Sequence, residues 1–89
     1  MNLIFKIQKS GQKGKVPVEV ILKDKNKVIG RETVGNAEKV LEGLDRIFKK
    51  SRIGMTAIKN IQTIDLNKNR YTSYRIVRSI EKALKLKIF

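Results

Sequence analysis

The sequence predicts an α+β domain, a mixed four-stranded sheet with two helices in the order β-β-β-α-β-α. Two observations carry this prediction. The first third of the chain alternates bulky apolar and polar residues with a period of two, which is typical of strands. Two later segments space apolar residues three and four apart, as amphipathic helices do, and a short strand-like segment separates them. All 89 residues (1–89) form one domain, because two independent cores need a longer chain.

Three strands are expected first. Alternation covers residues 3–8, returns over 16–23, and returns again over 28–34 after the polar turn 24–27. Short connections favour an antiparallel meander. The loop 9–15 is rich in Lys and Gly but lacks the Gly-Lys-Ser/Thr ending of a P-loop, so we expect a flexible basic hairpin loop.

The first helix is predicted after Gly35. Asn36 is a suitable N-cap, because its side-chain oxygen can accept an amide hydrogen bond from the next turn, and Gly54 is placed to end the helix. Acidic residues come early and basic residues late, as the helix dipole prefers. The apolar stripe comprises Val40, Leu41, Leu44, Ile47 and Phe48.

A fourth strand is predicted over residues 60–66, followed by a last helix that Thr72 or Ser73 can cap and that runs to about Lys85. The buried stripe of this helix is expected to be Ile76, Val77, Ile80, Ala83 and Leu84. A strand that returns after a helix favours parallel pairing with the first strand through a right-handed crossover. Both helices then need the sheet or a partner to cover their apolar stripes.

The composition excludes several classes of protein. The absence of Cys, His and Trp rules out disulfide staples, zinc fingers, thiol nucleophiles and histidine bases. No apolar run approaches the roughly 18 residues of a membrane span, and a lysine interrupts the N-terminus too early for a signal-peptide core. We therefore expect a cytoplasmic protein with no membrane association, cofactor or metal.

The acidic residues do not predict an active site. A nuclease that depends on Mg²⁺ gathers several carboxylates around the ion. Four of the eight acids here belong to a turn or to the solvent face of the first helix, and the other four lie on separate elements: Glu19, Glu32, Asp65 and Glu81. Asp65 stands near a strand end, where turn-forming acids are common. We predict no enzyme.

The net charge favours a polyanionic partner. The chain has 21 Lys and Arg against 8 Asp and Glu, a balance of +13. At about 100° per residue, four cations of the last helix fall within one arc of its surface. Arg70 and Tyr71 come just before this helix. The expected nucleic-acid-binding residues are therefore Arg70, Tyr71, Arg75, Arg78, Lys82 and Lys85. The alternative is an ordinary solvated face in a Lys-rich protein from an AT-rich genome, with Tyr74 packed as core.

Three segments carry a family resemblance. Residues 44–51 (LDRIFKKS), 58–64 (IKNIQTI) and 71–84 (YTSYRIVRSIEKAL) resemble the TsaB family, the inactive partner subunit in bacterial threonylcarbamoyladenosine modification of tRNA. Thr72, Arg75 and Ile76 fall on the T, R and I of the family's "FTGLRIG" segment. The family's Gly-Pro-Gly turn is replaced by 67–70 and the aspartate of its first strand is missing, so no phosphate-cradling loop is expected.

The resemblance implies a ribonuclease-H-like half domain of the actin/Hsp70 type, corresponding to the first of the family's two lobes. It also implies a non-catalytic accessory subunit that pairs through its helices with a homologous TsaD-type protein or with itself. The helix residues assigned to this partner interface are Leu44, Phe48, Ile76 and Ile80, which we expect to be buried while their neighbours make the contact. A small RNA- or DNA-binding protein, with tRNA as one candidate ligand, is the alternative.

Overall fold

The protein is described by a computed structural model over residues 1–8, 16–66 and 72–88. The elements follow the predicted order, with a short 3-10 helix before and another after the first α-helix. In chain order they are β1 (Asn2–Ile7), β2 (Val18–Asp24), β3 (Lys27–Val34), η1 (Ala37–Lys39), α1 (Val40–Ser51), η2 (Met55–Ala57), β4 (Asn60–Asp65) and α2 (Thr72–Ile88). The α+β prediction is confirmed, and the basic loop 9–15 lies outside the described residues.

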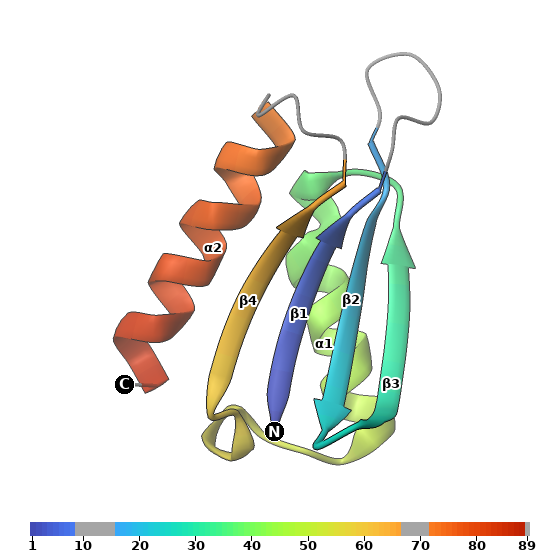
Figure 1. Cartoon of the computed structure of the whole chain (residues 1–89), viewed down its shortest axis with the longest axis vertical. Coiled ribbons are helices and arrows are strands. Elements are labelled where there is room, and N and C mark those ends of the chain that lie inside the picture. The colour runs from blue at the N-terminus through green and yellow to red at the C-terminus, as the bar shows by residue number, and fades with distance from the viewer. Residues whose placement is uncertain (9–15, 67–71, 89) are drawn as a thin grey trace.

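The four strands form one mixed sheet in the order β3-β2-β1-β4 (Figure 1). β1 pairs antiparallel with β2, and β2 pairs antiparallel with β3, which is the predicted meander. β4 pairs parallel with β1, with Leu3 opposite Ile61. A parallel pair needs a crossover connection, and α1 supplies it. The predicted return of the fourth strand to the side of the first is confirmed.

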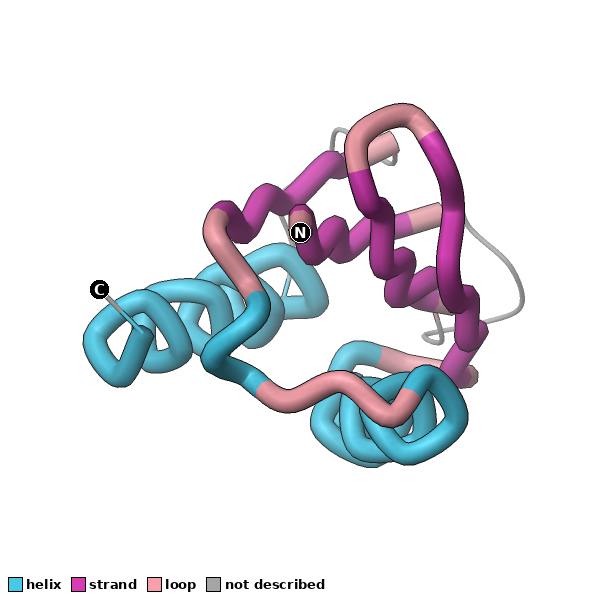
Figure 2. Tube along the Cα trace, turned by 90° about the horizontal axis from the view of Figure 1, so that it is seen from below, coloured by secondary structure: helices cyan, strands magenta, loops and turns pink. Residues whose placement is uncertain are grey.

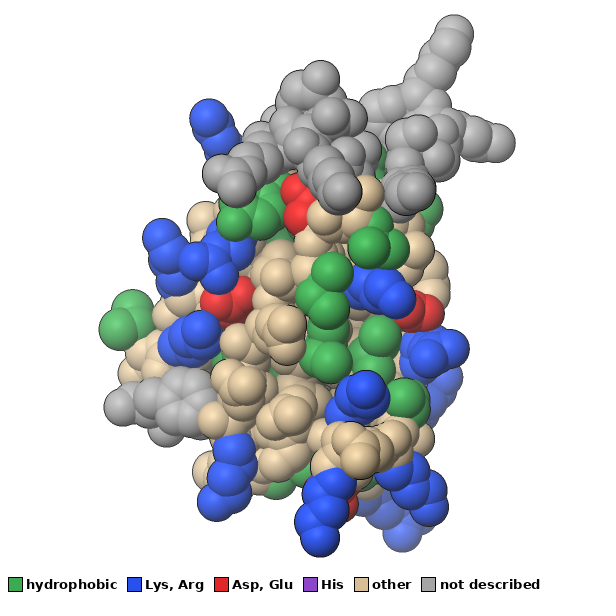
Figure 3. Space-filling view, in the orientation of Figure 1, with side chains coloured by type: hydrophobic (Ala, Val, Ile, Leu, Met, Phe, Trp, Pro, Cys, Tyr) green, Lys and Arg blue, Asp and Glu red, His purple; other side chains and the backbone are tan. Residues whose placement is uncertain are grey.

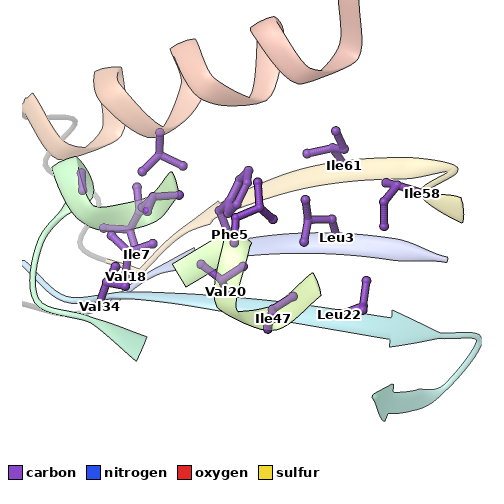
Figure 4. Close-up of a cluster of buried hydrophobic side chains, with 14 residues drawn as sticks. Leu3, Phe5, Ile7, Val18, Val20, Leu22, Val34, Ile47, Ile58 and Ile61 are labelled. Atoms are coloured by element: carbon purple, nitrogen blue, oxygen red, sulfur yellow. The ribbon is translucent and has the colours of Figure 1, made fainter. Parts of the chain in front are cut away.

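Both α-helices cover the same face of the sheet (Figure 2). α1 packs on β2 and β3, whereas α2 packs on β4, β1 and η1. Between the sheet and the helices lies one apolar core (Figure 4), comprising Leu3, Phe5, Ile7, Val18, Val20, Leu22, Val34, Ala37, Val40, Leu44, Ile47, Ile58, Ile61 and Val77. Removal of this apolar surface from water, at about 25 cal/mol per Å², is the main stabilising term of the fold.

Both predicted ends of the first helix are wrong in detail. The Asn36 side chain makes no capping hydrogen bond; its backbone carbonyl instead accepts one from the amide of Lys39, at 3.2 Å, and so begins η1. The chain leaves α1 at Arg52, two residues before Gly54, with Arg52 in the left-handed region at φ 55°. The amides of Arg52 and Ile53 both donate to the Phe48 carbonyl, so the helix ends on a left-handed residue with the 5→1 bond of the αL motif and the 6→1 bond found in Schellman ends.

The last helix ends at Ile88, three residues beyond the predicted end at Lys85. The capping role expected of Thr72 or Ser73 depends on side chains outside the described part of the structure. No described helix combines the length and the apolar character that crossing a bilayer requires.

Candidate docking surface and basic stripe

The four cations expected on the last helix lie on one flank of α2, and we call them the basic stripe: Arg75, Arg78, Lys82 and Lys85. Their side chains differ in exposure. Arg75 and Lys82 are exposed, whereas Arg78 and Lys85 are partly buried. Arg70 and Tyr71, the two other residues expected to bind nucleic acid, lie outside the described residues.

Glu81 holds the two partly buried cations of the stripe. It is 2% exposed, and its carboxylate lies 2.7 Å from the Arg78 guanidinium and 3.0 Å from the Lys85 ammonium. The hydroxyl of Thr63 in β4 donates to the other carboxylate oxygen. One buried carboxylate therefore neutralises part of the stripe and ties α2 to the edge strand of the sheet.

The surroundings of Glu81 favour its ionised form. Burial works to raise the pKa of the Glu81 carboxyl, because water no longer solvates the charge. Hydrogen bonds from Thr63 and Lys85, together with the charge of Arg78, outweigh burial and place the pKa of Glu81 below its ordinary value of 4.5. A buried charge that is paired and hydrogen-bonded is the arrangement proteins tolerate.

One flank of α1 faces the β3 edge of the sheet. A Cβ placed on Gly43 would come within 2.8 Å of Val34, and the Lys50 ammonium donates to the Glu32 carboxylate of β3 at 2.7 Å. At about 100° per residue, Leu41 and Phe48 project from the opposite flank of the helix. That flank faces toward α2, because α2 covers the other edge of the sheet.

The apolar flank of α2 faces α1 in the same way. Glu81 and its cations lie beside β4, which is the edge strand farthest from β3. At about 100° per residue, Ile76, Ile80 and Ala83 project from the opposite flank, toward α1. The two inward flanks lie on the same side of the sheet, and we call their apolar residues the helical face: Leu41, Phe48, Ile76, Ile80 and Ala83.

The residues of the helical face are incompletely covered. Phe48, Ile76 and Ile80 are partly buried against the core, while Leu41 is 56% exposed. Ala83 is also exposed. The expectation that Ala83 belongs to a buried stripe is therefore wrong, and Leu41 of the first apolar stripe is likewise exposed, because no element among the described residues covers these positions.

The four residues assigned to the partner interface fall into two groups. Leu44 is 5% exposed and belongs to the core, so it supports the helical face from beneath. Phe48, Ile76 and Ile80 keep part of their surface open to solvent. The structure thus leaves these three, like Leu41, partly at the surface and places Leu44 inside.

Two other acids on separate elements, Glu19 and Glu32, also meet cations. Glu32 accepts from Lys50 and lies 3.8 Å from Arg46, so it joins β3 to α1. The hydrogen bond from Lys50 is the main reason that the pKa of Glu32 lies below its ordinary value of 4.5. Glu19 lies 3.4 Å from Arg31. Within the described ranges, no three acidic side chains gather into a group that could hold a metal ion.

Two features of this surface were missed by sequence reasoning. The pairing of Glu81 is signalled by its spacing, three residues after Arg78 and four before Lys85, because side chains at these spacings are neighbours on a helix. The exposure of Leu41 has no comparable signal, since periodicity marks an apolar stripe without showing which margin of it is covered.

Comparison of the chain with known protein families and with curated proteins finds no match.

Proposed function

We propose that this is a non-catalytic, cytoplasmic interaction module that docks through its helical face onto the helical face of a second copy of the chain. The observation that carries the proposal is the incompletely covered apolar side chains of two helices on one side of the sheet. Leu41 leaves 56% of its area in water, and Phe48, Ile76 and Ile80 of the same two helices are only partly buried. Association would remove this apolar surface from water.

The charges of the two helices also support pairing between copies. The exposed N-terminal half of α1 carries Glu42 and Asp45, whereas α2 exposes Arg75 and Lys82. In a dimer with two-fold symmetry, the same patch of each subunit meets its counterpart. Where α1 of one copy lies against α2 of the other, the acidic residues of α1 attract the basic stripe at the outer margin of α2.

A role as a TsaB-like accessory subunit in threonylcarbamoyladenosine modification of tRNA extends this proposal. It is supported by the resemblance of residues 44–51, 58–64 and 71–84 to that family; residues 44–51 fall in α1 and residues 72–84 in α2. The resemblance also offers a homologous TsaD-type protein of the actin/Hsp70-like fold as an alternative partner. The ion pairs that engage Glu19, Glu32 and Glu81 support a structural rather than catalytic use of these acids.

Sedimentation velocity of two matched variants tests the docking surface. Leu41→Asp puts a charge into the helical face, and Val28→Asp puts the same charge on β3, at a valine that is 39% exposed. We expect the wild type and Val28→Asp to sediment as dimers and Leu41→Asp as a monomer with unchanged circular dichroism. Dimers of both variants would overturn the helical face as the interface.

Nucleic-acid binding through the basic stripe is the second candidate function. It is favoured by the +13 charge and by the exposure of Arg75 and Lys82 on one flank of α2. A single-stranded RNA probe should lose more affinity with Arg75→Glu/Lys82→Glu than with Lys25→Glu/Lys27→Glu, although both double variants change the net charge equally. Equal losses would mean that only net charge attracts the probe.

A further inference from the structure

No helix of the described residues lies on the second face of the sheet. In Figure 1 α1 lies behind the strands and α2 stands beside β4, and Figure 2 shows both helices on the same side, so the viewer of Figure 1 looks directly at the second face. We call it the open face and define it by three isoleucines and three cations: Ile4, Ile21, Ile64, Lys6, Lys23 and Arg31. These residues alternate along their strands with residues of the core or of the helix-covered side.

Isoleucines of the two central strands, β1 and β2, form the centre of the open face, and a third isoleucine lies on the edge strand β4. Ile4 of β1 lies directly opposite Ile21 of β2, and Ile64 of β4 lies opposite Lys6. Ile21 is only 7% exposed, and Ile4 and Ile64 are partly buried. In the space-filling view, hydrophobic side chains gather over the middle strands (Figure 3). The solvated side of an antiparallel sheet normally carries polar residues, so this apolar centre is unusual.

Cations surround that centre. Lys6 lies toward one end of the strands, Lys23 toward the other, and Arg31 on β3. Glu19 is the one carboxylate among the alternating strand residues of this side; it lies 3.4 Å from Arg31 and opposite Lys6 in the β1–β2 register, so one negative charge stands among the three cations. On the remaining side, beside β4, lies the basic stripe of α2, and Figure 3 shows Lys and Arg side chains around the margins of the view. The open face therefore has an apolar centre and a basic rim.

We propose that the open face binds an amphipathic helix of a partner protein, with apolar side chains of that helix on the isoleucines and its carboxylates on the basic rim. Lys23 of β2 lies opposite Asn2 of β1, and Lys6 is four residues further along β1, so Lys6 and Lys23 are separated by four residue pairs along the strands. Four pairs span about 13 Å at roughly 3.3 Å per residue. A helix rises about 1.5 Å per residue, so the partner presents carboxylates about nine residues apart along its margins.

Charge and shape argue against the other occupants of this surface. The open face of a second copy would bring two basic rims together, and like charges across an interface repel. Single-stranded nucleic acid is held by aromatic stacking, and the alternating residues that form this side of the described strands include no aromatic residue. The recessed Ile21 does not protrude far enough to enter a bilayer.

A designed peptide of about 18 residues, five helical turns, serves as the probe. It carries a leucine stripe with glutamates on both margins, and a twin peptide carries lysines in their place. We expect saturable binding of the glutamate peptide, with amide shift changes in the NMR spectrum at Ile4, Ile21 and Ile64. The lysine twin should bind about tenfold or more weakly. Equal binding of the twins, or shift changes confined to α2, would overturn the proposal.

Two kinds of variant keep the test independent of folding. Lys6→Glu/Lys23→Glu changes surface charges only, and it should reverse the preference so that the lysine peptide binds more tightly. Ile64→Asp should lower the affinity for the glutamate peptide by about tenfold or more. Leu41→Asp, on the opposite side of the sheet, should leave that affinity unchanged. A preference that survives the charge reversal contradicts the proposal. The proposal is also contradicted if anionic lipid vesicles or a single-stranded RNA bind through the same residues more tightly than the glutamate peptide does.

Discussion

The two faces of the sheet are formed by the same strands, but their side chains differ in exposure to solvent. On the helix-covered face, Leu3 and Phe5 are fully buried and Ile7 is 1% exposed. On the open face, Ile4 and Lys6, which alternate with them along β1, remain partly exposed. A strand directs successive side chains to opposite faces, so the difference is made entirely by what lies above each face.

This difference separates what stabilises the domain from what is available to partners. The helix-covered face contains the core and should dominate the free energy of unfolding. The helical face on the outer side of that layer and the open face beyond the sheet both keep apolar surface in water. Substitutions in β1 and in the helices can therefore distinguish folding from binding.

The largest expected effect compares Phe5 with Ile4. Phe5→Ala should lower the free energy of unfolding by about 3–5 kcal/mol, because it removes a fully buried ring and leaves a cavity. Ile4→Ala, one residue away on the open face, should cost about 1 kcal/mol. Urea unfolding followed by circular dichroism measures both values. Equal costs would show that the open face is covered as completely as the core.

The same comparison within α1 uses Leu44 and Leu41. Leu44→Ala should cost about 2–5 kcal/mol, since the side chain is 5% exposed in the core. Leu41→Ala should cost less than about 1 kcal/mol, because more than half of that leucine already contacts water. Thermal melting at a concentration where the protein is monomeric gives both numbers. An unchanged melting temperature for Leu44→Ala would contradict its place in the core.

Gly43 tests how closely α1 approaches the sheet. An added Cβ would lie 2.8 Å from a methyl carbon of Val34, which is closer than packed carbons tolerate, so Gly43→Ala should cost about 1–3 kcal/mol. Gly35→Ala is the matched control, because no heavy atom outside its chain neighbours lies within 4 Å of a Cβ there. It should change stability by no more than about 0.5 kcal/mol. A stabilising Gly43→Ala would show that the helix has room to move outward.

Glu81 gives the smallest expected effect and a dependence on pH. Its pKa in the folded protein lies below the ordinary value, so the unfolded chain binds the proton more tightly. The stability contributed by the carboxylate is fully present above about pH 4.5 and is lost as the pH falls through the folded pKa. Glu81→Gln should lower stability at pH 7 by about 1–2 kcal/mol and flatten the acid limb of the profile. If Glu81→Gln loses stability at acidic pH as steeply as the wild type, other carboxylates cause that loss.

The fold was predictable because each strand shows a local pattern that tertiary packing reinforces. Alternation over residues 3–8 and 16–23 assigns Leu3, Phe5 and Val20 to one face of the sheet and their chain neighbours to the other. Because one face is buried, this assignment also fixes the register in which the strands pair. The N-cap was not predictable in this way. Asn36 has the extended backbone of a cap, but the turn after it closes with 3-10 hydrogen bonding, so its carbonyl rather than its side chain accepts the amide.

The candidate surfaces were only partly predictable. The arc of cations on α2 follows from helical geometry alone, and α2 presents it as expected. The division of that arc by Glu81 depends on contact with Thr63, which lies 18 residues away in the sequence. The exposure of Leu41 depends on which sheet edges the two helices occupy. Such long-range packing leaves no trace in the periodicity of a single segment.

The molar mass of the wild-type protein, measured by light scattering across salt concentrations, tests the central claim most directly. Docking through the apolar helical face predicts a dimer of about 20 kDa, twice the chain mass of 10.2 kDa, from about 0.05 to 1 M salt. Salt screens surface charges but does not weaken the burial of apolar surface. A monomer at every concentration, or a dimer that dissociates as salt is added, would contradict the account.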